Sequence, residues 1–208
     1  MPNRTKDLIK ETFLNILDQT PFDKITVTDI VQTCGINRNT FYYHFQDIYH
    51  LVDEIMEDDF FNLRKEEVSY STLKETLMAG LKKVRERKRS CYHLYRSEYR
   101  EALLRFLYRI VLESTELYFE VLADDLQVDS ESMTIVERFY AHALVGTITD
   151  WLNANMNYDL ETYLNKTLDI FQDSPRRVLQ HMSDKNLGCV TPEAETETGS
   201  EKAEMAEN

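Results

Sequence analysis

Residues 38–44 (RNTFYYH) contain a guanidinium, a carboxamide, a hydroxyl, two phenols and an imidazole. Such groups hydrogen-bond to phosphate oxygens and to base edges, and one arginine can pair with guanine O6 and N7 together, which is worth roughly 1–3 kcal/mol of discrimination. Phe41 and Phe45 recur at i and i+4, so one side of a short helix here is predicted to be fixed to a core. The other side is polar and aromatic, and it is the surface on which chemistry is expected.

Several elements must position this segment. Apolar residues share one face over residues 6–18, which predicts a first amphipathic helix. Thr26 followed three positions later by Asp29 is a capping-box arrangement, and it starts a second, short helix. Gly35 ends that helix, because glycine adopts the left-handed conformation of a tight turn without steric cost. Asn37 is placed to cap the polar-faced helix that follows.

The long helix that comes next is predicted from its Asp47 cap to about residue 65. Helix, glycine turn, short polar-faced helix and long helix form the layout of a helix-turn-helix DNA reader. The second helix braces the third, and the turn sets the angle between them. The exposed face of the third helix is thereby left free to enter a major groove.

The same block resembles the signature of the TetR/AcrR family of transcriptional regulators. The residues that carry the resemblance are Thr26, Asp29-Ile30, Gly35 and Thr40-Phe41-Tyr42-Tyr43-His44-Phe45. The resemblance implies an all-α fold, with a three-helix DNA-binding head and a larger body that binds an effector and forms dimers. It also implies a double-stranded DNA operator, a homodimer, an unknown small-molecule effector and no cofactor.

The resemblance further assigns roles to single residues in the DNA-binding set. Carried over by position, Thr28, Tyr42, Tyr43 and His44 would hydrogen-bond phosphates, and Thr26 belongs to the same surface. Arg38, Asn39 and Thr40 would approach base edges. The chain departs from the family where a lysine usually grips a phosphate, because Ile48 occupies that position. Arg4, Lys6 and Lys10, or the helix N-terminus at Asp47, are the expected compensation.

Beyond the head the chain is predicted to be helical over about 72–87, 91–96, 98–126, 131–154 and 159–182, and Ser174-Pro175 could divide the last of these into two pieces. The predicted organisation is a head at 1–48, a ligand-binding and dimerisation body at 49–182, and an acidic disordered tail at 183–208. The tail is inferred from its many acids and its lack of large apolar residues.

Aromatic residues with polar tips gather in two parts of the body, at 91–119 and 139–151. Such residues line largely apolar pockets, and they also form ordinary core. The candidate ligand-binding residues are Tyr95, Tyr99, His142 and Trp151.

Small residues on one helical face favour close helix packing, and the face formed by Ala143, Gly146 and Thr147 resembles the family's dimer interface. Packing within the chain is the alternative. Dimerisation has its own rationale, because a short reading helix covers few base pairs and specificity needs two half-sites about 34 Å apart.

A formal net charge of −13 argues at first against a nucleic-acid partner. The head, however, has five Lys and Arg against six Asp and Glu and is nearly neutral, so most of the acid lies in the body and tail. No segment has the length of a membrane span or the apolar core of a signal peptide, which favours a cytoplasmic protein. Cys34, Cys91 and Cys189 are expected to be free thiols, with no metal site.

These observations favour a sequence-specific DNA-binding transcriptional regulator, expected to be a ligand-responsive repressor and not an enzyme. One alternative is a regulator of the same kind that acts through a protein partner without a small effector. A helical enzyme or metal-binding bundle is the other alternative, but no nucleotide loop, nucleophile motif or paired metal motif is present in the sequence.

Overall fold

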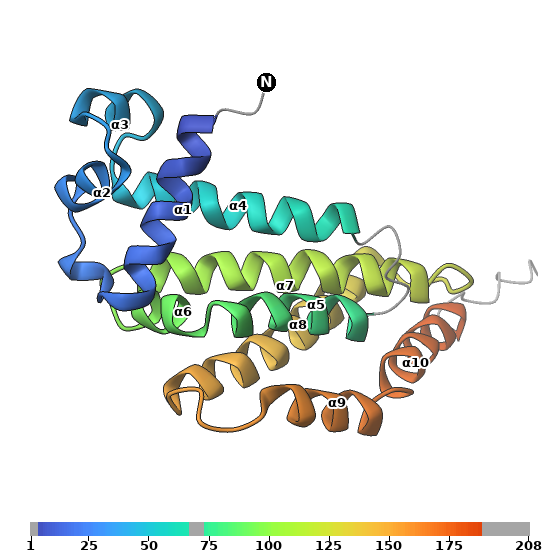
Figure 1. Cartoon of the computed structure of the whole chain (residues 1–208). Coiled ribbons are helices and arrows are strands. Elements are labelled where there is room, and N and C mark those ends of the chain that lie inside the picture. Colours follow the sequence, from blue (N-terminus) through green and yellow to red (C-terminus); the bar gives the residue numbers. More distant parts are fainter. Residues whose placement is uncertain (1–3, 67–72, 189–208) are drawn as a thin grey trace, which may run out of the picture.

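The computed structural model describes residues 4–66 and 73–188 (Figure 1). Within these residues the chain forms ten α-helices and one short 3-10 helix, with no strand. The first elements are α1 (Arg4–Gln19), η1 (Phe22–Lys24), α2 (Val27–Cys34), α3 (Arg38–His44) and α4 (Ile48–Glu66). The remaining ones are α5 (Leu73–Glu86), α6 (Lys88–Tyr95), α7 (Arg100–Leu122), α8 (Ser130–Asn153), α9 (Leu160–Ile170) and α10 (Ser174–Gly188). The predicted all-α fold is confirmed.

The N-terminal core forms where α1, α2, α3 and the first turns of α4 meet. Phe13, Ile30 and Phe41 are fully or almost fully buried in it, and the α4 residues Leu51 and Val52 join them. Leu94 and Tyr99, which lie beside the turn between α6 and α7, belong to the same cluster, and α1 packs against α6. The head is therefore joined to the body by a continuous apolar core that extends past residue 48.

The body is built around α7 and α8, which pack along each other. Helix α4 runs beside α7 (Figure 1), and the two are joined by the Arg109–Glu57 ion pair. Its core contains residues of α5, α7, α8 and α9. Trp151 is 5% exposed near the end of α8, and its indole N–H donates to the Tyr158 carbonyl oxygen at 2.9 Å. A buried tryptophan with its polar atom satisfied fixes the loop between α8 and α9.

The C-terminal region differs from the predicted boundaries in two ways. The predicted helix at 159–182 is divided into α9 and α10, and the break at Ser174 is the predicted one. The predicted tail began at residue 183, whereas α10 continues to Gly188. Ser183 is buried and its hydroxyl accepts a hydrogen bond from the Gln127 backbone N–H at 3.1 Å, a tertiary contact that composition does not reveal. Residues 189–208, with Cys189, lie outside the described residues.

Candidate nucleic-acid interface

Helix α2 begins with a complete capping box. The Thr26 hydroxyl accepts a hydrogen bond from the Asp29 backbone N–H at 3.2 Å, and the Asp29 carboxylate accepts from the Thr26 backbone N–H at 2.9 Å. Hydrogen bonds from the Thr26 side chain and then its backbone lower the pKa of Asp29. Through this cap Thr26 positions the start of α2, and its membership of the DNA-binding set stays a prediction. Thr28, in the first turn of α2, is exposed.

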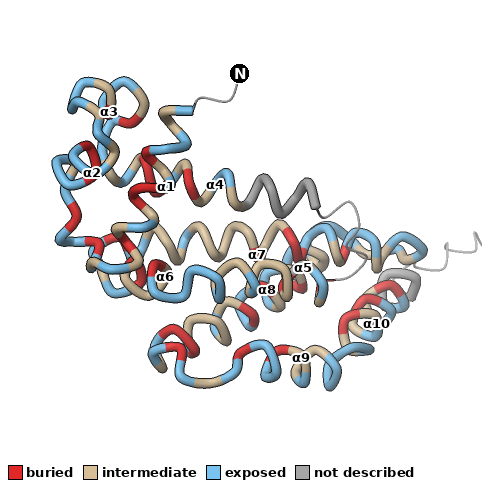
Figure 2. Tube along the Cα trace, in the orientation of Figure 1, coloured by how far each residue is buried: buried red, intermediate tan, exposed pale blue. Residues whose placement is uncertain are grey.

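The turn between α2 and α3 is formed as predicted. Gly35 has a φ of +68° at the α2 C-cap, and the Asn37 side chain accepts from the Thr40 backbone N–H at 2.8 Å. Phe41 and Phe45 are 0% and 1% exposed and fix α3 to the core. These contacts hold α3 rigidly by one side only, and Figure 2 shows most of its remaining surface exposed.

The exposed side of α3 brings together four of the predicted residues. Arg38 and Asn39 are exposed in the first turn, and the Arg38 guanidinium carbon lies 5.9 Å from the centre of the Tyr42 ring. Tyr42 and Tyr43 are 47% and 84% exposed. An arginine held beside an aromatic ring is oriented while its N–H groups remain free to donate. This surface, which we call the α3 reading face, contains Arg38, Asn39, Tyr42 and Tyr43.

Two other predicted residues are partly engaged inside the head. Thr40 is half-buried, and its hydroxyl donates to the Asn37 side-chain oxygen at 3.0 Å. His44 is half-buried beside Tyr43, with 5.0 Å between the two ring centres. Both residues therefore lie at the border between the α3 reading face and the core.

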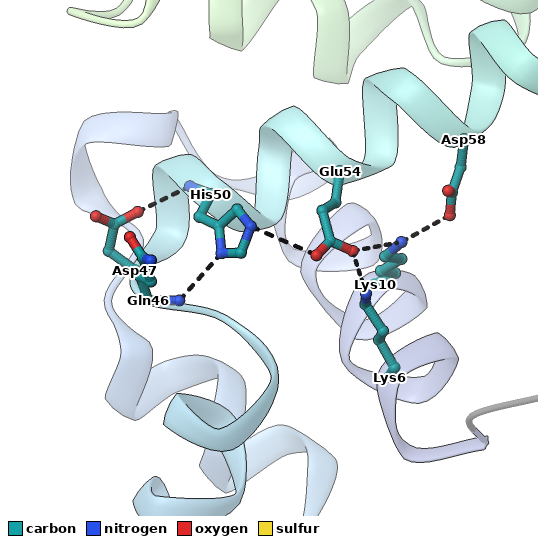
Figure 3. Close-up of polar contacts among 7 residues, drawn as sticks. All are labelled: Lys6, Lys10, Gln46, Asp47, His50, Glu54 and Asp58. Atoms are coloured by element: carbon teal, nitrogen blue, oxygen red, sulfur yellow. Dashed lines mark hydrogen bonds and ion pairs between the residues drawn. The ribbon is translucent and has the colours of Figure 1, made fainter.

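The first residues of α4 provide no lysine or arginine that could bind a phosphate. Ile48 packs partly against the head core, and the Tyr49 hydroxyl hydrogen-bonds to the Glu98 carboxylate in the body. His50 Nδ1 accepts from the Gln46 backbone N–H at 3.2 Å, so its other nitrogen, Nε2, bears the proton and lies 3.4 Å from Glu54 (Figure 3). These side chains are directed toward neighbouring elements of the protein.

The lysines of α1, two of the residues expected to compensate for Ile48, form ion pairs within the protein. Lys6 pairs with Glu54 of α4, and Lys10 lies between Glu54 and Asp58 (Figure 3). Burial opposes ionisation of Glu54, but hydrogen bonds and charges from the two lysines outweigh it and lower its pKa. We call Lys6, Lys10, Glu54 and Asp58 the α1–α4 charge cluster. Its acids, Glu54 and Asp58, were not predicted from the sequence, although they recur at i and i+4.

A cavity of about 250 Å³ lies between the head and the body. Its wall includes Leu14 and Leu17 of α1 and Ile55 and Met56 of α4, together with side chains from α5 to α9. Of the four candidate ligand-binding residues, Trp151 lines this cavity.

The structure places the other three candidates elsewhere. Tyr95 is buried, but its hydroxyl donates to Asn153 at 2.6 Å and accepts from Arg100 at 2.8 Å. Tyr99 lies in the core shared by head and body, where its hydroxyl bonds to Asp53. His142 is exposed on α8 and donates to the Arg138 carbonyl oxygen at 2.6 Å. None of these three residues lines this cavity, because aromatic type alone does not distinguish a pocket wall from core or surface, and a ligand-binding role for them stays a prediction.

Comparisons with known proteins agree with this geometry. Residues 14–55 match the family model described as bacterial regulatory proteins, tetR family. Residues 71–173 match one described as transcriptional regulator C-terminal region. The chain belongs to the TetR family. It is therefore a DNA-binding transcriptional regulator, and TetR-family regulators bind DNA operators and act as dimers.

Individual relatives extend the comparison. The chain is 35% identical over 66 residues to the HTH-type dhaKLM operon transcriptional activator DhaS of Lactococcus lactis subsp. lactis (strain IL1403), a match that spans 32% of this chain and 35% of that protein. A solved structure of dihydroxyacetone kinase operon activator DhaS aligns with a TM-score of 0.69 at 19% identity, over 86% of this chain and 98% of that one.

Two further solved structures show the same TetR fold. NalD of Pseudomonas aeruginosa, the secondary repressor of the MexAB-OprM multidrug efflux pump, aligns with a TM-score of 0.54 at 22% identity, over 85% of this chain and 96% of that one. The fatty acid degradation regulator FadR of Bacillus halodurans aligns with a TM-score of 0.53 at 16% identity, over 88% of this chain and 96% of that one. At these identities the alignments show the fold alone.

The TetR body exposes an apolar and small-residue face on α8. Ala143 is exposed, and Thr147 donates its hydroxyl to the Ala143 carbonyl oxygen at 2.9 Å. An added Cβ at Gly146 would meet open space. One and two turns earlier along the same helix, Phe139 and Ile135 are 69% and 59% exposed. We call these five residues the α8 face. Large apolar side chains beside small ones are typical of a surface that packs against another helix.

None of the described helices is both long enough and apolar enough to cross a bilayer. The described residues also contain no group of three or more His, Cys, Asp or Glu side chains placed to hold a metal ion.

Proposed function

We propose that this TetR-family chain is a homodimer whose affinity for a DNA operator changes when a small molecule enters the cavity between head and body. The observation that carries the proposal is the composition of the cavity wall. Leu14, Leu17, Ile55 and Met56 belong to the helices that hold α3, while most of the wall belongs to the body. A ligand there contacts both parts at once, so it can favour one arrangement of the heads over another.

On DNA, the α3 reading face enters the major groove. Arg38, Asn39 and Thr40 approach base edges from the first turn of α3, while Thr28 and the aromatic residues Tyr42, Tyr43 and His44 hydrogen-bond phosphates. The exposure of Arg38 and the tyrosines supports this assignment. Thr26 contributes through its cap at the start of α2. Phosphate contacts orient the head, and base contacts provide the sequence preference.

The link between cavity and head runs through α4 and α6. Tyr99 at the start of α7 bonds to Asp53 of α4, and His93 Nδ1 of α6 donates to the Leu17 carbonyl oxygen at 2.6 Å. A ligand shifts the heads only by as much as it binds one arrangement better than the other. The first bond joins the start of α7 to α4, and the second joins α6 to α1 of the head. A displacement of α4 or α6 is therefore transmitted to the head.

Dimerisation through the α8 face places two heads on one operator. A partner's α8 packed on Ala143 and Gly146 would also bury the exposed Phe139. Two half-sites one helical turn apart then supply a specificity that one short α3 does not. A DNA partner also requires the protein to be in the cytoplasm. We propose a head of residues 1–48 and a body that begins at residue 49 and, because α10 continues to Gly188, extends past the predicted end at 182. Helix α4 belongs to both, since its first turns pack in the head core.

The proposed transcriptional output is repression. A dimer on an operator blocks access to the DNA without any further contact, so repression needs only the reading heads. DhaS is an activator and NalD a repressor, so both outputs occur on this fold. A reporter gene behind the chain's own upstream region should be expressed more strongly after deletion of the protein, and weaker expression would indicate activation.

The test of operator binding is a gel shift with DNA from around the chain's own gene. The unchanged protein should shift one fragment at concentrations that leave random DNA free. Arg38→Ala should lose this preference by roughly tenfold or more, as expected for one bidentate guanine contact of roughly 1–3 kcal/mol. Arg89→Ala removes the same charge from an exposed site in the body and is the control. Unchanged preference in Arg38→Ala would overturn the base-reading role.

A further inference from the structure

The interior of the cavity is mostly apolar. Leucine, isoleucine, valine and aromatic side chains from α5 to α9 form most of its wall, among them Leu77, Leu107 and Trp151. Its volume of about 250 Å³ is just below the roughly 300–1,000 Å³ that is usual for drug-sized ligands. A molecule that fills the cavity is therefore small, and its affinity comes mainly from the removal of its apolar surface from water.

Two hydroxyls on this wall have no hydrogen-bond partner among the described residues. They belong to Ser90 of α6 and Ser114 of α7, which are 3% and 9% exposed and both line the cavity. Thr115, next to Ser114, behaves differently, because its hydroxyl donates to the Val111 carbonyl oxygen at 2.7 Å. The two serine hydroxyls are therefore the ones left for a molecule inside the cavity.

Among the described residues no fully enclosed side-chain oxygen lacks a hydrogen-bond partner, so these two hydroxyls are open to the cavity space. Each can therefore donate to a ligand that accepts its hydrogen bond. Both can donate to the same kind of acceptor, since a hydroxyl rotates to suit its partner. The two serines therefore define the polar part of the ligand.

The charges on the wall restrict the ligand further. Lys83 and Arg87 of α5 and the following turn, and Asp59 of α4, are exposed or half-exposed, so their charged ends reach solvent. Cys91 is half-buried, and desolvation raises the pKa of its thiol to about 11, which keeps it uncharged at neutral pH. An ionised group away from Asp59, Lys83 and Arg87 would face a mostly apolar wall, and burying it there would be costly.

We propose that the effector is a small, uncharged and largely apolar molecule with a hydrogen-bond acceptor, such as a ketone or ester oxygen, that binds the hydroxyls of Ser90 and Ser114. This inference rests on the proposed function, because it names the chemical class of the ligand for the same cavity. The two hydroxyls favour a ligand with an acceptor oxygen, and the apolar wall favours a ligand whose remaining part is apolar.

The single tryptophan of the chain makes the test direct, because Trp151 lines the cavity and its fluorescence reports on what enters. The probes are 2-octanone, octanoate and octylammonium, which share a chain length and differ in charge. With the full-length protein and no DNA, 2-octanone should change the fluorescence saturably and raise Tm. The two charged probes should bind at least tenfold more weakly.

Three variants refine the result. The double variant Ser90→Ala with Ser114→Ala should weaken 2-octanone binding about tenfold, which corresponds to about 1.4 kcal/mol. The control is Ser132→Ala on α8, which lies outside the cavity wall and should leave binding unchanged. Gly80→Leu should abolish binding in a folded protein, because Gly80 lines the cavity and an added Cβ there meets open space.

Several outcomes would overturn the proposal. These are no saturable response to 2-octanone, equal binding by the double serine variant, or tighter binding of octanoate that is lost in Lys83→Ala with Arg87→Ala. Because no DNA is present, these results are separate from operator binding. If 2-octanone binds as expected but operator affinity does not change, the ligand class stands and the proposed effector response is wrong.

Discussion

Lys10 of α1 holds its ammonium group 2.6 Å from the carboxylate of Asp58 on α4. The same ammonium lies 3.3 Å from Glu54, which also pairs with Lys6 (Figure 3). Two of the five Lys and Arg residues in the first fifty are therefore neutralised within the head. With Ile48 where the family usually has a lysine, the head approaches DNA with few free cations. Its affinity for random DNA should be low, with a shallow dependence on salt.

Glu54→Gln tests this consequence of the α1–α4 charge cluster. Without the carboxylate, Lys6 becomes available to a phosphate, so binding to random DNA should strengthen. The slope of log K against log salt should steepen by about 0.9 for each additional phosphate that a lysine neutralises. Gel shifts or fluorescence anisotropy at several salt concentrations measure this slope.

Glu101→Gln is the control for Glu54→Gln, because it removes the same charge from an exposed residue on α7. An equal change of slope in both variants would mean that net charge alone acts, and that the pairing with Lys6 and Lys10 is irrelevant.

The sequence predicted the helix-turn-helix well because local chemistry determines it. The Thr26 cap, the left-handed Gly35 and the Asn37 cap are all confirmed, and each depends on residues within four positions of one another. The signals at these positions do not require knowledge of the rest of the chain.

The cavity and the charge cluster could not be predicted in the same way. Ser90 and Ser114 lie on different helices, α6 and α7, and line the same cavity only because those helices pack together. Tyr99 is an aromatic residue with a polar tip, the type that lines pockets, yet tertiary packing places it in the core shared by head and body. Ser183 begins the stretch with the composition of an acidic tail, yet its bond to Gln127 holds it in the fold. Each of these outcomes depends on contacts between distant elements.

Tyr99→Phe should loosen the joint between head and body. Tyr99 is 3% exposed and stacks on Tyr49, and burial followed by its hydrogen bond to Asp53 raises the pKa of the hydroxyl. Loss of that bond should lower the free energy of unfolding by about 1 kcal/mol, which is about 2–4 °C in Tm for a chain of this size. Thermal unfolding measures this change in Tm. The control is Tyr43→Phe, because Tyr43 is 84% exposed. Equal Tm values for the two variants would contradict the prediction.

Stability at alkaline pH should depend on Tyr49. Its hydrogen bond to Glu98, followed by burial, raises its pKa to about 12. Because the folded value lies above the value of about 10 in the unfolded chain, the contribution is complete below pH of about 10 and is lost as pH rises toward 12. Urea unfolding across this range should show a smaller loss in Tyr49→Phe than in the unchanged protein. Parallel curves would show that the bond to Glu98 contributes nothing.

Gly35 and Gly80 should respond to alanine with opposite signs. An added Cβ meets open space at both positions, so sterics from neighbours do not decide the outcome. Gly35 has a φ of +68°, where an alanine is unfavourable by roughly 1–2 kcal/mol. Gly80 lies inside α5, where alanine is favoured over glycine by about 1 kcal/mol. Chemical denaturation should therefore show Gly35→Ala less stable and Gly80→Ala more stable, and a shift of the same sign in both would refute the backbone argument.

Gly146→Arg should separate the proposed dimer without unfolding the protomer. Gly146 belongs to the α8 face, and its added Cβ meets nothing within 4 Å in the single chain. Against a partner's α8, however, an arginine would hold the helices apart and bury a charge without a counter-ion. Sedimentation at micromolar concentration should show a monomer with native helical content, and operator affinity should fall because two heads no longer bind together. Glu101→Arg on α7 places an arginine away from the α8 face and should remain dimeric; a Gly146→Arg dimer of unchanged affinity would place the interface elsewhere.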